Sequence, residues 1–151
     1  MTLSWAWVET SLAMIIGLII EYNGPIDGCA EAPVSLKKKL QFFRKSLRSI
    51  EALKPFQERG TILAERIGHL GSSRNNLVHG ASWQIHEGSF HALGLKAAGA
   101  QYAPQNHTFN VDDTIALNVE IGALSDDITI FMVDVARMFE ESPGGKHGSK
   151  S

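Results

Sequence analysis

Features that would place the chain outside the cell or in a membrane are scarce. Cys29 is the only cysteine, so no disulfide can form within the chain, and we expect a reducing compartment. No lysine or arginine precedes Lys37, which argues against a secretory signal peptide because such peptides begin with a basic segment. The most apolar run, residues 12–20, is far shorter than the roughly 20 residues that a membrane-spanning helix needs. We therefore expect a cytoplasmic protein that does not enter a membrane.

The motifs of common cofactor and metal enzymes are also missing. The sequence has no glycine-rich phosphate loop, no nucleophile elbow and no internal repeat. His86, His91 and His107 lie in a segment of alternating polarity, but no cysteine pair or ligand spacing accompanies them. We interpret them as exposed strand residues, and we expect neither a metal nor a cofactor.

The 151 residues suit one domain, with an apolar share of 44% that is sufficient for a core. Their first half predicts three helices. We expect the first helix over residues 4–22 and the second from Ser35, its cap, to about Leu53. Pro55 suits the first turn of a third helix that ends near Gly80. Its glycines predict either a break near residues 71–73 or a close approach of another helix.

The second half changes its period. Alternating residues predict a β-hairpin formed by residues 83–86 and 90–95. Residues 97–105 are expected to form a loop, and residues 107–111 a further short strand. A last helix is expected over 114–141, capped by Asp112 or Asp113. The predicted fold is mainly α, a helical bundle with a small β-hairpin inserted before the last helix. It occupies residues 1–141, and 142–151 form a flexible tail.

Charge is unevenly distributed along the chain. Residues 36–74 contain ten Lys or Arg and three Glu, whereas residues 105–141 contain one Arg and eight acidic residues. This asymmetry indicates either a basic face for an anionic ligand or two solvated helices that attract each other. The basic-face interpretation predicts RNA contacts by five residues of the second helix, which could equally be no more than a solvated face: Lys37, Lys38, Arg44, Lys45 and Arg48.

The segment Arg74-Asn75-Asn76-Leu77-Val78-His79-Gly80 lies at the predicted end of the third helix. Asn75 and His79 are four residues apart and share one helix face. Arg74 projects about 140° away from His79, because successive helical residues are about 100° apart. A single chain therefore presents an incomplete site, which a second subunit could complete.

This segment resembles the signature of HEPN domains, in which an arginine, a polar residue, three further positions and a histidine form an active site. The family consists of small helical bundles, many of them metal-independent endoribonucleases. The resemblance implies a HEPN-like bundle, a homodimer in which two motifs face one cleft, and Arg74, Asn75 and His79 as catalytic residues.

The chemistry of these side chains agrees with that implication. Cleavage of RNA without a metal needs proton transfer from the 2′-hydroxyl and to the leaving oxygen, and stabilisation of the charged phosphorane. Histidine can transfer protons near neutral pH, and arginine presents a planar fork to phosphate oxygens. Asn75 would orient His79 or donate to the phosphate. The expected products carry 2′,3′-cyclic phosphate and 5′-hydroxyl ends.

The leading hypothesis is an endoribonuclease of the kind used in toxin–antitoxin or phage-defence systems. The alternative is a catalytically silent HEPN-like module that binds RNA, a nucleotide or a protein partner such as an antitoxin. A purely structural role also stays open, in which Arg74 pairs with an acid, Asn75 caps a helix end and His79 packs locally. These alternatives make different predictions for the surroundings of Arg74.

Overall fold

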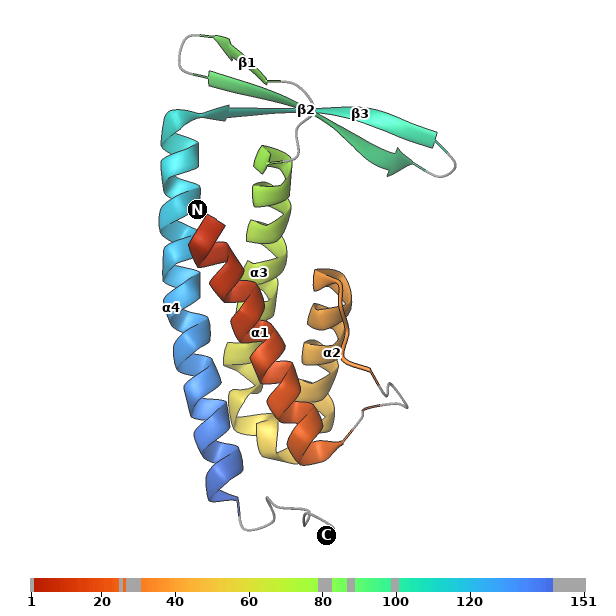
Figure 1. The fold of residues 1–151 in the computed structure, drawn as a ribbon, viewed down its shortest axis with the longest axis vertical. Helices are drawn as coiled ribbons and strands as arrows, with labels where there is room; N and C mark the ends of the chain where they lie inside the picture. The colour runs from red at the N-terminus through yellow and green to blue at the C-terminus, as the bar shows by residue number, and fades with distance from the viewer. Residues whose placement is uncertain are drawn as a thin grey trace. The chain divides into compact units, whose positions relative to one another are not determined.

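The computed structural model describes residues 2–24, 26, 31–78, 83–86, 89–98 and 101–142. It confirms a mainly helical fold with a small sheet before the last helix (Figure 1). The chain divides into two compact units, one made of residues 1–68 and 122–151 and the other of residues 69–121. The elements follow in the order α1 (Thr2–Asn23), α2 (Leu36–Ser49), η1 (Glu51–Phe56), α3 (Gln57–Val78), β1 (Trp83–His86), β2 (Ser89–Ala98), β3 (Gln101–Asn110) and α4 (Val111–Glu141).

The first unit is a bundle built from α1, α2, the first part of α3 and the second part of α4. Its core is centred on Phe131, whose ring meets those of Phe43 and Phe56 edge to face at centroid distances of 5.7 and 5.8 Å. The Trp7 indole Nε1 donates to Thr129 Oγ1 at 2.8 Å and so connects α1 to α4. Aromatic pairs of this geometry stabilise a core beyond the apolar area that they bury.

Helix α1 is a core helix of this bundle with one exposed side. Its buried face is at most 3% exposed and consists of Trp5, Val8, Leu12, Ile15, Ile16 and Ile19. The segment Leu3–Asn23 has a mean hydropathy of 1.7, so by length and composition it could cross a membrane. The run of residues 12–20 alone therefore underestimated the apolar length, because it left out apolar residues nearer the start of the same helix, such as Leu3, Trp5 and Val8. Buried core helices pass the same test.

Two boundaries of the predicted helices differ from the structure. Helix α2 ends at Ser49, with Ile50 in an extended conformation (φ −95°, ψ 118°), instead of continuing to Leu53. Pro55 lies in the 3-10 helix η1 and not in the first turn of α3. The change of helix type lets the chain reverse between α2 and α3 while Leu53 stays buried at 1% exposure.

Helix α3 is continuous through residues 71–73, so its glycines do not break it. Gly60 shows what they do instead. A Cβ atom there would lie 2.7 and 2.8 Å from the Leu47 Cδ atoms and 3.2 Å from Phe131 Cζ. Of the two predictions for this glycine-containing helix, the close approach of another helix is the one that the structure confirms.

The second unit contains the end of α3, the sheet and the start of α4. The sheet is antiparallel in the order β1-β2-β3. Its first hairpin is the predicted one, and Trp83 pairs there with Ala92. The predicted loop over 97–105 is wrong, because β2 runs to Ala98 and β3 begins at Gln101. Pro104 pairs in register with Leu95. It is tolerated because β3 is an edge strand, where the missing N–H can face away from the ladder.

Helix α4 begins three residues earlier than predicted, and its cap is Asn110 instead of Asp112 or Asp113. The Asp113 N–H donates to Asn110 Oδ1 at 2.6 Å, and the Asn110 N–H donates to Asp113 Oδ2 at 3.3 Å. This reciprocal arrangement is a capping box, which satisfies two backbone donors at the start of the helix. Of the predicted tail, only Ser142 lies within the described residues.

Candidate functional site

The last turn of α3 carries Arg74 on the inward side of the helix. Arg74 follows Leu70 by four residues and precedes Leu77 by three, and these two leucines are only 3% and 5% exposed. Residues at this spacing share one helix face. Arg74 therefore continues an apolar stripe, yet it is only partly buried. A guanidinium in this place needs hydrogen-bond acceptors, because a buried charge without partners is costly.

The acceptor that the structure provides is the neighbouring amide. Arg74 Nη1 donates to Asn75 Oδ1 at 3.1 Å, and Asn75 is exposed. No carboxylate within the described part of the chain forms an ion pair with Arg74, in contrast to the structural role in which Arg74 pairs with an acid. Asn75 lies inside α3, whose last residue is Val78, and does not cap it. His79 lies outside the described residues.

The bond between Arg74 and Asn75 uses only the oxygen of the Asn75 amide, which accepts from Arg74. The expectation that this amide orients His79 or contacts phosphate stays a prediction, which its NH2 group can still fulfil as a donor. Holding one terminal nitrogen restricts the rotation of the guanidinium. The remaining N–H groups of the planar fork keep a defined direction in which they can donate to an anion.

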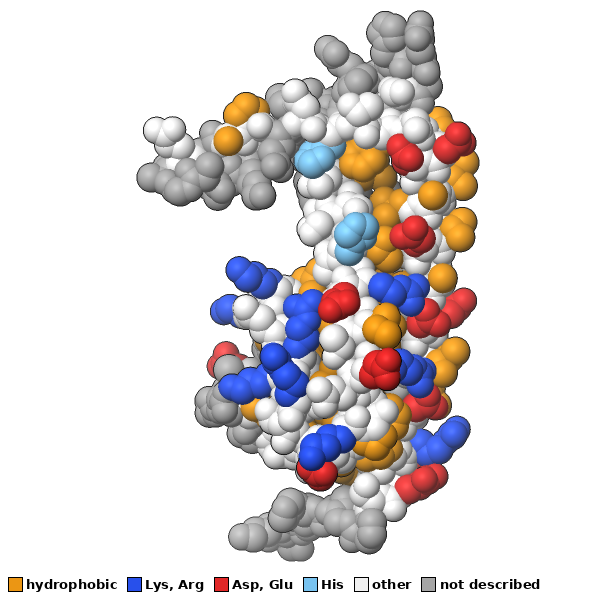
Figure 2. Space-filling view, turned by 180° about the vertical axis from the view of Figure 1, so that it is seen from behind, with side chains coloured by type: hydrophobic (Ala, Val, Ile, Leu, Met, Phe, Trp, Pro, Cys, Tyr) orange, Lys and Arg blue, Asp and Glu red, His pale blue; other side chains and the backbone are white. Residues whose placement is uncertain are grey.

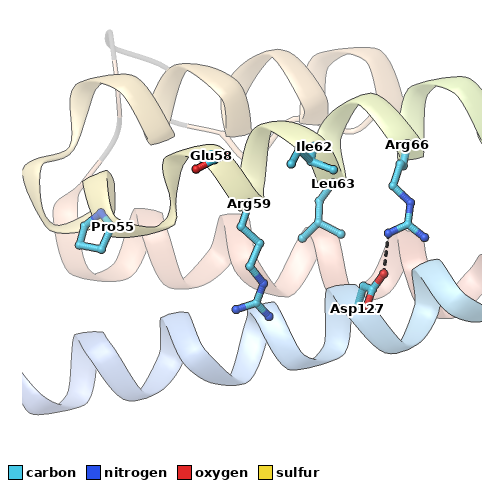
Figure 3. Close-up of a pocket in the computed structure, with 7 residues that line it drawn as sticks. All are labelled: Pro55, Glu58, Arg59, Ile62, Leu63, Arg66 and Asp127. Carbon is cyan, nitrogen blue, oxygen red and sulfur yellow. Dashed lines mark hydrogen bonds and ion pairs between the residues drawn. The ribbon is translucent and has the colours of Figure 1, made fainter.

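Two other arginines of α3 are used differently. Arg59 Nη1 pairs with Asp134 Oδ2 at 2.6 Å, and Arg66 pairs with Asp127, both across the bundle to α4. Figure 3 shows these arginines around a pocket of about 340 Å³ that is also lined by Ile62 and Leu63. Because both guanidinium groups already contact carboxylates, this pocket is a poor anion site. The opposite charges of the two regions therefore serve, at these two pairs, to attract one helix to the other.

The predicted RNA-contacting residues all lie on α2, which has six basic residues and no acidic one. Figure 2 shows Lys and Arg side chains on this side of the molecule, with Asp and Glu side chains between them. Arg44 is partly structural, since its Nη2 donates to the Ala64 carbonyl at 3.2 Å, and Arg48 Nε donates to the Arg44 carbonyl at 3.3 Å. Lys45 also has an interaction partner. Lys37 and Lys38 are exposed in the first turn, next to the cap Ser35.

The three histidines that we assigned to strands all lie on strands. His86 ends β1, His91 belongs to β2 and His107 belongs to β3. The side chains of His86 and His91 lie outside the described part of the structure, whereas the His107 ring stacks near Phe109 at 6.2 Å. Among the described residues, no group of three His, Cys, Asp or Glu side chains is placed to hold a metal ion. Cys29 lies outside the described residues.

A cleft of about 310 Å³ in the second unit was not predicted. We name it the Glu120 cleft; α3, β3 and α4 line it with residues that include His69, Ser73, Phe109, Asp113, Leu117 and Glu120. Neither a sequence motif nor a local charge cluster marks it. The signal that could have revealed it is the spacing of charges along α3 and α4, which becomes interpretable only when the register of the two helices is known.

Comparison of the chain with protein-family models, with curated proteins and with solved structures found no match.

Proposed function

We propose that the protein is a metal-independent endoribonuclease of the HEPN type, with Arg74 and His79 as its catalytic residues. The observation that supports this most is the state of Arg74. It occupies an inward position on α3, no described acid neutralises it, and the Asn75 amide holds one of its nitrogens at 3.1 Å. An arginine that donates to an amide instead of a carboxylate is not neutralised and is suited to bind an anion that arrives from outside.

The proposed reaction needs no group beyond these side chains and the RNA. His79 would transfer protons at the 2′-hydroxyl and at the leaving 5′-oxygen, a contribution typically of about 10²–10⁴-fold. Arg74 would stabilise the negative charge that develops on the phosphorane, and a preorganised donor is most effective there. Asn75 would act as a positioning residue through Arg74. The 2′-oxygen attacks phosphorus and the bond to the 5′-oxygen breaks, which leaves a 2′,3′-cyclic phosphate and a 5′-hydroxyl.

The proposal also includes the oligomeric state of the protein, its RNA contacts and its compartment in the cell. A homodimer would bring two motifs to one cleft, and the α2 lysines would bind RNA backbone without sequence preference. A toxin–antitoxin or phage-defence role in the cytoplasm, with an antitoxin as a further protein partner, fits an enzyme that cuts cellular RNA. The absence of any cleavage would favour the silent binding module instead.

The products provide the test. Single-stranded RNA is incubated with the protein in EDTA, and the ends of the fragments are identified by mass spectrometry. We expect cyclic phosphate and 5′-hydroxyl ends with the wild type, and none with His79→Ala, provided that circular dichroism shows the variant folded. Asn75→Ala should retain partial activity. Fragments with 5′-phosphate ends, or cleavage only with Mg²⁺, would contradict the mechanism.

A further inference from the structure

The pairing of α3 with α4 repeats at a spacing of seven residues and then stops. Arg59 and Arg66 are seven residues apart, as are their partners Asp134 and Asp127. Seven residues are about two helical turns, so such positions recur on one face. Seven further along α3 is Ser73, and seven earlier along α4 is Glu120. Ser73 and Glu120 therefore occupy the third pair of positions in this series. That pair has an acidic residue on α4 but no arginine on α3.

A cleft lies at the position where the series has no arginine, and both residues line it. Ser73 and Glu120 belong to the wall of the Glu120 cleft, whose volume is about 310 Å³. Ser73 Oγ donates to the His69 carbonyl at 3.3 Å, which keeps this short side chain against α3. Glu120 is exposed, and no ion pair with a described residue neutralises it. We expect an arginine at position 73 to extend into this cleft toward Glu120, since both positions line it.

The other walls favour a flat apolar ligand. Leu70 and Leu117, which are 3% and 9% exposed, are the buried apolar residues of its lining. Phe109 is partly buried in the wall from β3, and the His107 ring lies near it with an interplanar angle of 30°. Aromatic side chains of this kind stack unpaired nucleobases. The cleft thus combines an aromatic ring and two buried leucines with the carboxylates of Asp113 and Glu120.

The sign of its charge decides which part of an RNA could enter. Asp113 is occupied by the capping box of α4 but remains negative, and Glu120 adds a second negative charge. A phosphate would be repelled, whereas a base edge with N–H donors would be attracted. We propose that the Glu120 cleft is a guanine-binding subsite that selects the RNA sequence cut by this protein.

Guanine is the base whose edge matches a carboxylate. Its N1–H and N2–H₂ groups are adjacent donors, so both oxygens of Glu120 can accept at once. Adenine and cytosine each place a ring acceptor beside the amino group, and uracil flanks its single N–H with two carbonyl oxygens. Each of these acceptors would face the carboxylate and weaken binding.

This inference rests on the proposed function, and a binding experiment separates the two. Guanosine, inosine and adenosine 5′-monophosphates are titrated into the protein by calorimetry in EDTA. All three carry the same phosphate, and inosine lacks only the N2 amino group. We expect guanosine monophosphate to bind about tenfold more tightly than inosine monophosphate, the effect of one charge-assisted hydrogen bond. Equal affinities for guanosine and inosine monophosphates would overturn the guanine subsite, whether or not the protein cuts RNA.

Two variants locate the preference in this cleft. Glu120→Gln replaces one acceptor by a donor and should abolish the preference for guanosine over inosine. Ser73→Arg restores the missing pair, so it should fill the cleft and remove binding. Glu140→Gln is the matched control, an exposed glutamate on the same helix. A preference that persists in Glu120→Gln, or that is lost equally in Glu140→Gln, would exclude the proposed subsite.

Discussion

At the scale of single residues, the group that an arginine contacts indicates its role better than the residue type alone does. Arg59 and Arg66 contact aspartates, so their main effect is to hold α3 against α4. Such half-exposed pairs contribute little, about 0–1 kcal/mol each. Arg74 contacts an amide instead. An amide orients the guanidinium without neutralising it, which suits a group that must meet a phosphate.

Ser11 provides a residue-scale prediction about stability. Its hydroxyl is fully buried in α1 and has no hydrogen-bond partner within the described structure. Ser11→Ala removes an unsatisfied polar atom and should raise the free energy of unfolding by about 1 kcal/mol. Ser46→Ala is the control, because the Ser46 hydroxyl donates to the Phe42 carbonyl at 2.8 Å, and its loss should not stabilise the protein. Urea denaturation measures both; a Ser11→Ala variant less stable than the wild type would mean that the hydroxyl has a partner.

At the scale of elements, the helices are positioned by close contacts as well as by their apolar stripes. Gly60 allows α3 to approach Leu47 of α2, whereas at Gly122 of α4 no atom of the described residues, apart from the adjoining backbone of its own helix and its chain neighbours, lies within 4 Å of the place where a Cβ would be. The same residue type therefore has a packing role in one helix and none in the other.

Exchange of these two glycines for alanine tests the distinction. Gly60→Ala should lower the free energy of unfolding by about 1–3 kcal/mol, because Leu47 and Phe131 are fully buried and have little room to move. Gly122→Ala should raise it by up to about 1 kcal/mol through helix propensity alone. The midpoints of thermal unfolding provide the comparison. Equal shifts in the same direction would contradict the close approach of α2 to α3.

The basic residues of α2 form a second element-scale test. Lys37 and Lys38 are exposed, and replacement of both by alanine should weaken RNA binding similarly for all sequences. The slope of log affinity against log salt should fall by roughly 1.4, since each contact to single-stranded RNA contributes about 0.7. Arg44→Ala should mainly lower stability, because Arg44 donates to the Ala64 carbonyl. Fluorescence anisotropy at several salt concentrations measures the slope; an unchanged slope would assign the lysines to a solvated face.

At the scale of the whole molecule, the fold class could be predicted from sequence and several details could not. Helical periodicity predicted the bundle, and alternation predicted the first hairpin. Residues 97–105 were expected to form a loop but belong largely to β2 and β3, where the edge position of β3 tolerates Pro104. The sequence pointed to Arg74 and Asn75 through their spacing from His79. The Glu120 cleft depends on the register of α3 against α4, which no local pattern contains.

Oligomerisation is the prediction that belongs to the whole molecule. On a regular helix Arg74 and His79 project about 140° apart, so we expect each cleft to use residues of two chains. Sedimentation equilibrium should give a dimer at tens of micromolar. Mixed Arg74→Ala and His79→Ala chains should regain part of the activity that each lacks alone. A monomeric protein with full activity would exclude the composite site.

The central claim is that Arg74 drives RNA cleavage without a metal ion. Its most direct test is the initial rate of cleavage of single-stranded RNA in EDTA by the wild type, by Arg74→Ala and by Arg137→Ala, a matched exposed arginine on α4. The account predicts that Arg74→Ala loses at least about 10²-fold in rate while its circular dichroism spectrum is unchanged, and that Arg137→Ala cuts like the wild type. A folded Arg74→Ala variant that cuts RNA at the wild-type rate would contradict the account.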